Sequence, residues 1–299
     1  MLTHLHTLSG HQNPIYALSD GLDPNTFYSA GNDKGVVEWS LERMAFVKVL
    51  VPVQSSVYAL HRFENLLFIA QRSGVITVFD TVENVIRATL SFHKRAVFDL
   101  KTIAHKQELI STGEDGNVAV WSLKDYSLLY NFNVINDTLR VIAVSNDETE
   151  VALGCKDGVI RIYNSSDFAF QRQFTGHKMP VTSLQYAPMG TFLVSGSRDA
   201  QLKFWNLPGY ELQNQVGAHM FSIYGIAFHP SAPYFATCSQ DKSIKLWSSE
   251  DLKLYKILSL EKRTEGHFHS INKLMWSKDG RYLISTGDDR QVMIWRFQS

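Results

Sequence analysis

The chain has 299 residues, of which 44% are apolar and 12% aromatic, so it can bury a large core. Its 29 Lys and Arg residues balance 29 Asp and Glu residues, which argues against a protein dedicated to nucleic acids or membrane surfaces. No apolar run is long enough to span a bilayer, and the start MLTHLHTLSGH lacks the basic and apolar regions of a secretory signal.

In chain order, Leu2–Leu8 alternates apolar and polar residues, which predicts a lone strand. Gly10-His11 then opens a unit with predicted strands at Ile15–Leu18, Thr26–Ala30, Val36–Trp39 and Ala45–Leu50. An interval of 28 residues separates His11 from Trp39, and it recurs between His93 and Trp121, His177 and Trp205, His219 and Trp247, and His267 and Trp295. A spacing found five times predicts a repeated unit of about 40 residues.

Two further repeats keep the strand rhythm but lose the polar residues. Val53 and Ile69 replace His and Ser in the second repeat, as Ile135 and Leu153 do in the fourth, where Asp157 is kept. Losing both partners of a buried hydrogen bond together costs less than losing one. The retained Asp157 is expected either to bind turn amides or to be solvated. With these two, seven modules end on Trp39, Phe79, Trp121, Tyr163, Trp205, Trp247 and Trp295.

Seven units of short, evenly spaced strands predict an all-β fold, a seven-bladed β-propeller of four-stranded antiparallel blades. We expect residues 1–299 to form one such domain. Too little sequence follows Trp295 for a fourth strand, whereas the N-terminus has a spare one. We therefore expect Leu2–Leu8 to complete the last blade and cover its edge.

Cysteine usage bears on the cellular compartment. Cys155 and Cys238 occupy different positions in different repeats, so we expect no structural disulfide. Together with the N-terminal sequence, this predicts an intracellular, cytoplasmic protein.

At these residues the chain resembles the WD-repeat (WD40) family of β-propellers over essentially its whole length. One departure is that no Trp precedes an Asp, which follows the blade-ending aromatic only in Phe79-Asp80. The resemblance implies a buried chain in which the indole donates to a hydroxyl, the hydroxyl to His, and His to Asp. The sets are His11, Ser29, Asp33 and Trp39; His93, Ser111, Asp115 and Trp121; His177, Ser195, Asp199 and Trp205; His219, Thr237, Asp241 and Trp247; and His267, Ser285, Asp289 and Trp295.

His, Ser and Asp also form catalytic triads, so a hydrolase is an alternative interpretation. A triad is needed once, beside an oxyanion hole, whereas five copies at one spacing indicate a scaffold. We therefore expect no catalytic residue, metal or cofactor. His4 and His6 should share one face of the first strand, but no nearby carboxylate or Cys completes a metal site.

Propellers carry function on loops and rims, because their sheets are committed to packing. The resemblance places the start of each innermost strand and the turn before each Asp at the narrower, top mouth of the channel. There, aromatic residues and a mainly basic arc over blades two to five, with Glu114 as the exception, resemble a binding hot spot. The candidate partner-binding residues are Tyr16, Tyr58, Phe98, Tyr224, Arg72, Arg95, Arg140, Lys156, Lys178, Arg198, Phe268 and His269. The alternative is that the rings pack on one another and the charges are solvated.

One connection is unusually long. Trp247 and His267 are 20 residues apart, where five equivalent intervals take 14. The excess falls in Ser259–Gly266, which we expect to be a charged, flexible loop on the top face. It is either a partner contact or a tolerated insertion.

These features favour a non-enzymatic scaffold that binds a peptide or domain of a multiprotein assembly on its top rim. The alternative is an enzyme or small-ligand binder that uses the central channel. A third class, RNA or DNA binding through the basic arc, has the balanced net charge against it. We expect protein partners and no membrane partner.

Overall fold

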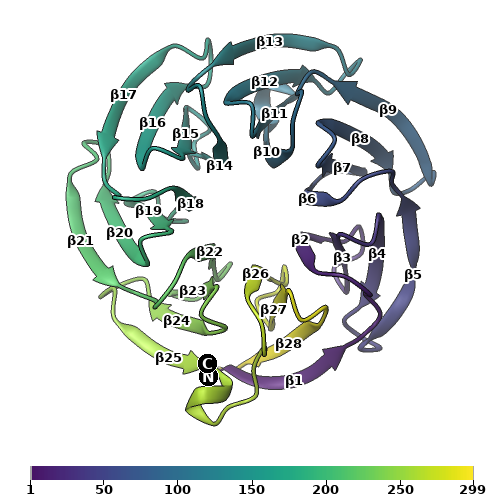
Figure 1. Cartoon of the computed structure of the whole chain (residues 1–299), viewed down its shortest axis with the longest axis vertical. Coiled ribbons are helices and arrows are strands. Elements are labelled where there is room, and N and C mark those ends of the chain that lie inside the picture. Colours follow the sequence, from purple (N-terminus) through teal and green to yellow (C-terminus); the bar gives the residue numbers. More distant parts are fainter. Residues whose placement is uncertain (1, 299) are drawn as a thin grey trace.

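The computed structural model describes residues 2–298, which form seven four-stranded antiparallel sheets around a central channel (Figure 1). Within blades one to six, the strands follow the chain from the channel to the rim. Blades one to three contain β2 (Ile15–Asp20), β3 (Thr26–Gly31), β4 (Gly35–Ser40) and β5 (Ala45–Pro52); β6 (Val57–Phe63), β7 (Leu66–Gln71), β8 (Val75–Asp80) and β9 (Val85–Ser91); and β10 (Val97–Ile103), β11 (Glu108–Gly113), β12 (Asn117–Ser122) and β13 (Leu128–Asn133).

The later blades repeat this arrangement. Blades four to six contain β14 (Leu139–Val144), β15 (Glu150–Cys155), β16 (Val159–Asn164) and β17 (Phe170–Thr175); β18 (Val181–Tyr186), β19 (Phe192–Ser197), β20 (Gln201–Asn206) and β21 (Leu212–Gly217); and β22 (Ile223–Phe228), β23 (Tyr234–Ser239), β24 (Ile244–Ser248) and β25 (Leu254–Leu258). Blade seven contains β26 (Ile271–Trp276), β27 (Tyr282–Gly287), β28 (Val292–Phe297) and β1 (Leu2–Leu8), and single 3-10 turns form η1 (Ala104–Lys106) and η2 (Leu260–Lys262).

The N-terminal strand closes the ring. β1 pairs antiparallel with β28, with Leu2 opposite Phe297 and Leu8 opposite Val292. Both leucine side chains are buried, and the Nζ atom of Lys256 donates to the carbonyl oxygen of Leu2 at 2.7 Å. The predicted all-β propeller and its closure by Leu2–Leu8 are therefore confirmed.

The core lies between the blades. Each pair of neighbouring sheets encloses a buried apolar cluster; between blades seven and one, Leu8, Phe27, Trp39 and Ile294 contribute. A blade therefore buries its apolar faces only against its neighbours, as expected for a repeat architecture. Within residues 2–298, neither short helix has the length and hydropathy needed to cross a membrane.

The turns that carry the repeated Asp require an unusual backbone. In every blade the residue after the Asp position has a positive φ. At Gly116 an added Cβ would lie 1.8 Å from the carbonyl oxygen of Ile135, because the loop entering the next blade passes directly over the turn. These turns and the loops between blades together make the top face, where the predicted binding residues were placed.

Candidate functional site

The repeated polar residues form buried hydrogen-bonded chains. In blade one, the indole Nε1 of Trp39 donates to Ser29 Oγ at 2.7 Å. The imidazole of His11 lies 2.7 Å from that oxygen through Nε2 and 2.6 Å from Asp33 through Nδ1. The other four sets repeat these contacts at distances between 2.7 and 3.1 Å: Trp121, Ser111, His93 and Asp115; Trp205, Ser195, His177 and Asp199; Trp247, Thr237, His219 and Asp241; and Trp295, Ser285, His267 and Asp289.

Because these hydrogen-bonded sets are buried, they stabilise the fold and are not accessible to a substrate. Burial lowers the pKa of His11, His177 and His219 below the ordinary value for histidine. A neutral imidazole can accept from the hydroxyl and donate to the carboxylate, which links the loop, the sheet and the turn of one blade. The serine and threonine hydroxyls are 0% exposed, so no substrate reaches them.

The two degenerate blades replace this chain in different ways. In blade four, Asp157 accepts from Arg161 at 3.2 and 2.8 Å and from the backbone nitrogen of Val159 at 3.0 Å. In blade two, the buried Gln71 donates to Thr77 Oγ1 at 3.0 Å and accepts from the Ser55 nitrogen at 3.3 Å. Sequence reasoning missed Arg161 and Gln71, although both are polar residues inside otherwise apolar strands.

The channel-facing rim residues all stand on β-bulges. In each innermost strand the register shifts between the first residue and the third, so the second has no partner on the neighbouring strand. A bulge re-aims a side chain, and here it directs seven side chains toward the channel. These residues are Tyr16, Tyr58, Phe98, Arg140, Thr182, Tyr224 and Asn272, and all seven line the channel.

Part of this ring is a continuous stack. The ring centroids of Tyr16 and Tyr58 are 5.4 Å apart, those of Tyr58 and Phe98 are 5.3 Å apart, and the Arg140 guanidinium lies 4.4 Å from the centroid of Phe98. The rings therefore do pack on one another, while remaining only half-buried beside a channel of about 960 Å³. Tyr224 stands apart from the stack and packs against the core between blades six and seven.

The basic arc is partly neutralised within the chain. Arg95 lies 3.6 Å from Glu114, and Lys156 lies 3.0 Å from Asp137, a carboxylate that the sequence analysis did not include in the arc. Across residues 2–298, by contrast, no carboxylate lies within 4.0 Å of the remaining candidate cations: Arg72, Arg140, Lys178 and Arg198.

The top face also carries an apolar arc, which sequence reasoning missed apart from Phe268. Met220 is 80% exposed and Phe221 is 56% exposed, directly after the repeated His219 of blade six. Met179 and Phe268 are exposed in the corresponding loops of blades five and seven, and Phe268 contacts His269 with ring centroids 4.9 Å apart. The sequence does contain a pattern that indicates this arc. The two positions after each repeated His, or after the residue that replaces it, hold a large apolar residue only in blades five to seven.

The long connection is an ordered turn. Residues Leu260–Lys262 form η2, and the hydroxyl of Ser259 caps it by accepting from the Lys262 nitrogen at 3.3 Å. Thr264 Oγ1 closes the loop by accepting from the Ser259 nitrogen at 2.8 Å. Figure 1 shows this turn at the outer edge of the ring, beside β25 and β1. Ser259–Gly266 therefore contains an ordered, hydrogen-bonded turn where a flexible loop was expected.

The expected placement of His4 and His6 is wrong. The register of β1 shifts at Leu5, so His4 lies opposite Trp295 and His6 opposite the adjacent Ile294. Neighbouring residues of a strand point to opposite faces, and the two histidines are therefore separated. Within residues 2–298, no group of three His, Cys, Asp or Glu residues is placed to hold a metal ion.

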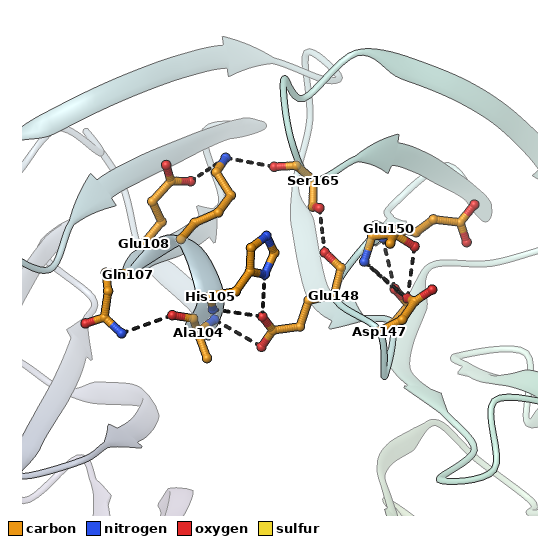
Figure 2. A network of polar contacts seen from close by, with 11 residues as sticks. Ala104, His105, Gln107, Glu108, Asp147, Glu148, Glu150 and Ser165 are labelled. Carbon is orange, nitrogen blue, oxygen red and sulfur yellow. Dashed lines mark hydrogen bonds and ion pairs between the residues drawn. The ribbon is translucent and has the colours of Figure 1, made fainter.

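On the opposite face of the ring, polar groups satisfy one another. Figure 2 shows Glu148 of blade four reaching blade three, where it accepts from the backbone nitrogens of Ala104 and His105 at 3.0 Å and approaches the His105 ring at 2.7 Å. Lys106 crosses in the other direction and donates to the Ser165 carbonyl at 2.8 Å. This network joins two blades and leaves its charged groups engaged, unlike the top rim.

Comparison with known proteins agrees with this architecture. The family model described as WD domain, G-beta repeat matches residues 2–40, 84–122, 168–206, 210–248 and 258–296. The segment 84–122 joins β9 of one blade to β10, β11 and β12 of the next, so the sequence unit spans two blades. The unmatched stretches contain the three inner strands of blades two and four, whose polar sets are replaced.

Individual relatives match only in part. WD repeat-containing protein 90 of Xenopus tropicalis is 32% identical over 127 residues, 40% of this chain and 7% of that protein. The 66 kDa stress protein of Physarum polycephalum is 27% identical over 197 residues, which are 63% of this chain and 31% of that protein. The U3 small nucleolar RNA-associated protein 4 homolog of Homo sapiens is 22% identical over 157 residues, which are 52% of this chain and 23% of that protein. The matched part is thus less than a third of each relative's length. Because the family model itself matches more than half of the chain, this protein belongs to the WD domain, G-beta repeat family.

Proposed function

We propose that this propeller is a non-enzymatic scaffold that binds a peptide or domain of a larger assembly on its top rim. Members of the WD-repeat family are commonly protein-interaction scaffolds, and the propeller fold of the family is generally non-enzymatic. The observation that carries the proposal is the contrast between the two faces. Four cations of the top face have no carboxylate within 4.0 Å among residues 2–298, and Met179, Met220, Phe221 and Phe268 are exposed in three consecutive loops. On the opposite face Met189 and Leu22 are exposed in separate blades, and the Glu148–His105 pair joins blades three and four.

The channel supports binding better than catalysis. Of its lining carboxylates, Asp99 accepts from the backbone nitrogen of Ile142 at 2.8 Å, and Asp288 accepts from the side chain of Asn272 at 2.7 Å. Asp99 also accepts from the Leu100 nitrogen at 3.0 Å, so both of its oxygens are engaged. Asp288 is hydrogen-bonded through one oxygen, but among residues 2–298 no Ser, Thr, Cys or Lys side chain donates to it, as an activated nucleophile would. We also propose an intracellular location, since Cys155 and Cys238 are free and buried.

An affinity capture from lysate, followed by mass spectrometry, tests the proposal. The bait pair is the wild type and Tyr16→Ala/Tyr224→Ala, and Leu129→Ala on the exposed outer strand β13 is the matched control. We expect one set of proteins to bind wild type and Leu129→Ala but not the double variant, with circular dichroism showing that all three baits are folded. Capture that is equal for all three baits would place binding elsewhere and contradict the proposal.

A further inference from the structure

We propose that the rim partner is an acidic peptide segment that also carries a large apolar side chain. Its carboxylate would bind Arg140 at the channel mouth, and its apolar side chain would cover Met220 and Phe221. This inference rests on the proposed function, because it specifies the partner chemistry of the same rim. Three observations support it.

The first observation is the state of Arg140. Its guanidinium stacks on Phe98 at 4.4 Å, and within residues 2–298 its side chain has neither a hydrogen bond nor a carboxylate within 4.0 Å. Stacking holds the planar group in place and leaves its N–H edges free, which is the geometry that binds a carboxylate in bidentate fashion. The group is therefore positioned for an anion that the chain itself does not supply.

The second observation is the charge of the channel. Its lining includes Lys101, Lys273 and Lys278 besides Arg140, and in residues 2–298 only Lys278 of these has a carboxylate within 4.0 Å, Asp20 at 3.1 Å. Two carboxylates, Asp99 and Asp288, also line the channel, so the lining carries four cations against two anions. A channel with a net positive charge concentrates anionic ligands. A neutral or basic segment would leave these cations unpaired.

The third observation is the apolar arc. The loop that carries Met220 and Phe221 is held rigidly, since the Met220 nitrogen donates to Asp241 at 3.0 Å and His219 bonds the same carboxylate at 2.9 Å. Exposed Met and aromatic residues on an ordered loop are typical of protein interfaces. Nucleic-acid binding depends chiefly on phosphate contacts over a strongly basic surface, whereas this chain has a formal net charge of zero, so a peptide is favoured over a nucleic acid.

A selection from a random dodecapeptide display library tests the inference. The targets are wild type and Arg140→Met, which keeps the aliphatic stem but removes the charge. Arg43→Met is the matched control, because Arg43 is exposed in a turn of the opposite face. We expect peptides rich in Asp and Glu, with one Leu, Met or aromatic residue, to be enriched on wild type and Arg43→Met only.

Synthetic versions of the selected peptides are then measured by fluorescence anisotropy. Losing a charge-assisted bidentate contact should weaken binding to Arg140→Met by about tenfold or more, with Arg140→Lys intermediate. The double variant Met220→Ser/Phe221→Ser should also bind weakly. Circular dichroism and melting curves show whether each variant is folded.

The outcomes separate the two proposals. Peptides that are neutral or basic but still need Tyr16 and Tyr224 would overturn the acidic partner and leave the scaffold proposal standing. Acidic peptides that bind Arg140→Met unchanged would likewise overturn it. A poly(U) RNA that binds more tightly than any selected peptide, and loses binding in Arg140→Met, would assign the site to nucleic acid. No enrichment on any target would overturn both.

Discussion

Replacing Ser195 by alanine should destabilise the protein strongly, because the Ser195 hydroxyl is the central group of the hydrogen-bonded chain in blade five. Ser195 Oγ accepts from the Trp205 indole at 2.8 Å and lies 2.7 Å from Nε2 of His177, and it is fully buried. Alanine would leave both partners without a bond, in a place that water does not reach. Each buried group left unsatisfied costs about 1–3 kcal/mol, so the loss of both bonds should lower the free energy of unfolding by about 2–6 kcal/mol.

Thermal and urea denaturation, followed by circular dichroism, provide the measurement. For a chain of this length the change corresponds to a melting temperature about 3–10 °C lower, and the exposed Ser231→Ala should stay within about 0.5 kcal/mol of wild type. The substitution His177→Val/Ser195→Ile, which copies blade two, should cost less than the sum of its single changes. A Ser195→Ala protein that melts with the Ser231→Ala control would refute the role of the hydroxyl.

Two further predictions concern closure and pH. Leu8→Ala should cost about 2–5 kcal/mol, because this side chain of β1 is 4% exposed, and deleting residues 2–8 should lower the melting temperature further. An exposed change in the same strand, His6→Ala, is the control, and equal melting of all three would contradict closure. Acidification should also destabilise the fold. Burial lowers the pKa of His177 and His219, so the folded chain keeps them neutral while the unfolded chain protonates below about pH 6.5. The stabilisation that comes from keeping these histidines neutral is present above that pH and is lost as the pH falls. The melting temperature at about pH 5.5 should therefore lie below that at about pH 8. The difference between the two melting temperatures should be smaller in His177→Val/Ser195→Ile, which lacks one of these histidines. A pH-independent melting temperature would contradict this.

Much of the fold follows from the sequence because hydrogen bonds demand fixed residue types. An indole, a hydroxyl, an imidazole and a carboxylate can form one chain only if each occupies its own place, so the spacing of Trp205, Ser195, His177 and Asp199 repeats wherever the chain does. The lone strand Leu2–Leu8 could be paired with the last blade for a similar reason, since every other blade has its own fourth strand.

The candidate site follows less well from the sequence. Exposed positions such as Met220 and Phe221 obey no packing period, and only the structure shows how far their side chains are exposed. Cross-turn pairs such as Lys156 with Asp137 depend on side-chain rotamers rather than on spacing. The register shift at Leu5 could not be predicted from the sequence. A bulge changes the face of the sheet to which the following side chains point, without interrupting the alternation of apolar and polar residues.

The seven bulges also separate recognition from folding. Because a bulge residue has no partner across the ladder, exchanging Tyr16, Tyr58 or Arg140 removes no backbone hydrogen bond and no cross-strand pair. Thr182 and Asn272 differ, because their side chains donate to the carbonyl oxygens of Ile223 and Ile15 in the neighbouring blades at 2.6 and 3.0 Å. The other five positions are mounted on a fixed frame and aimed at a common axis. Such a frame can acquire a new ligand preference one position at a time, with the stability of the blades left largely intact.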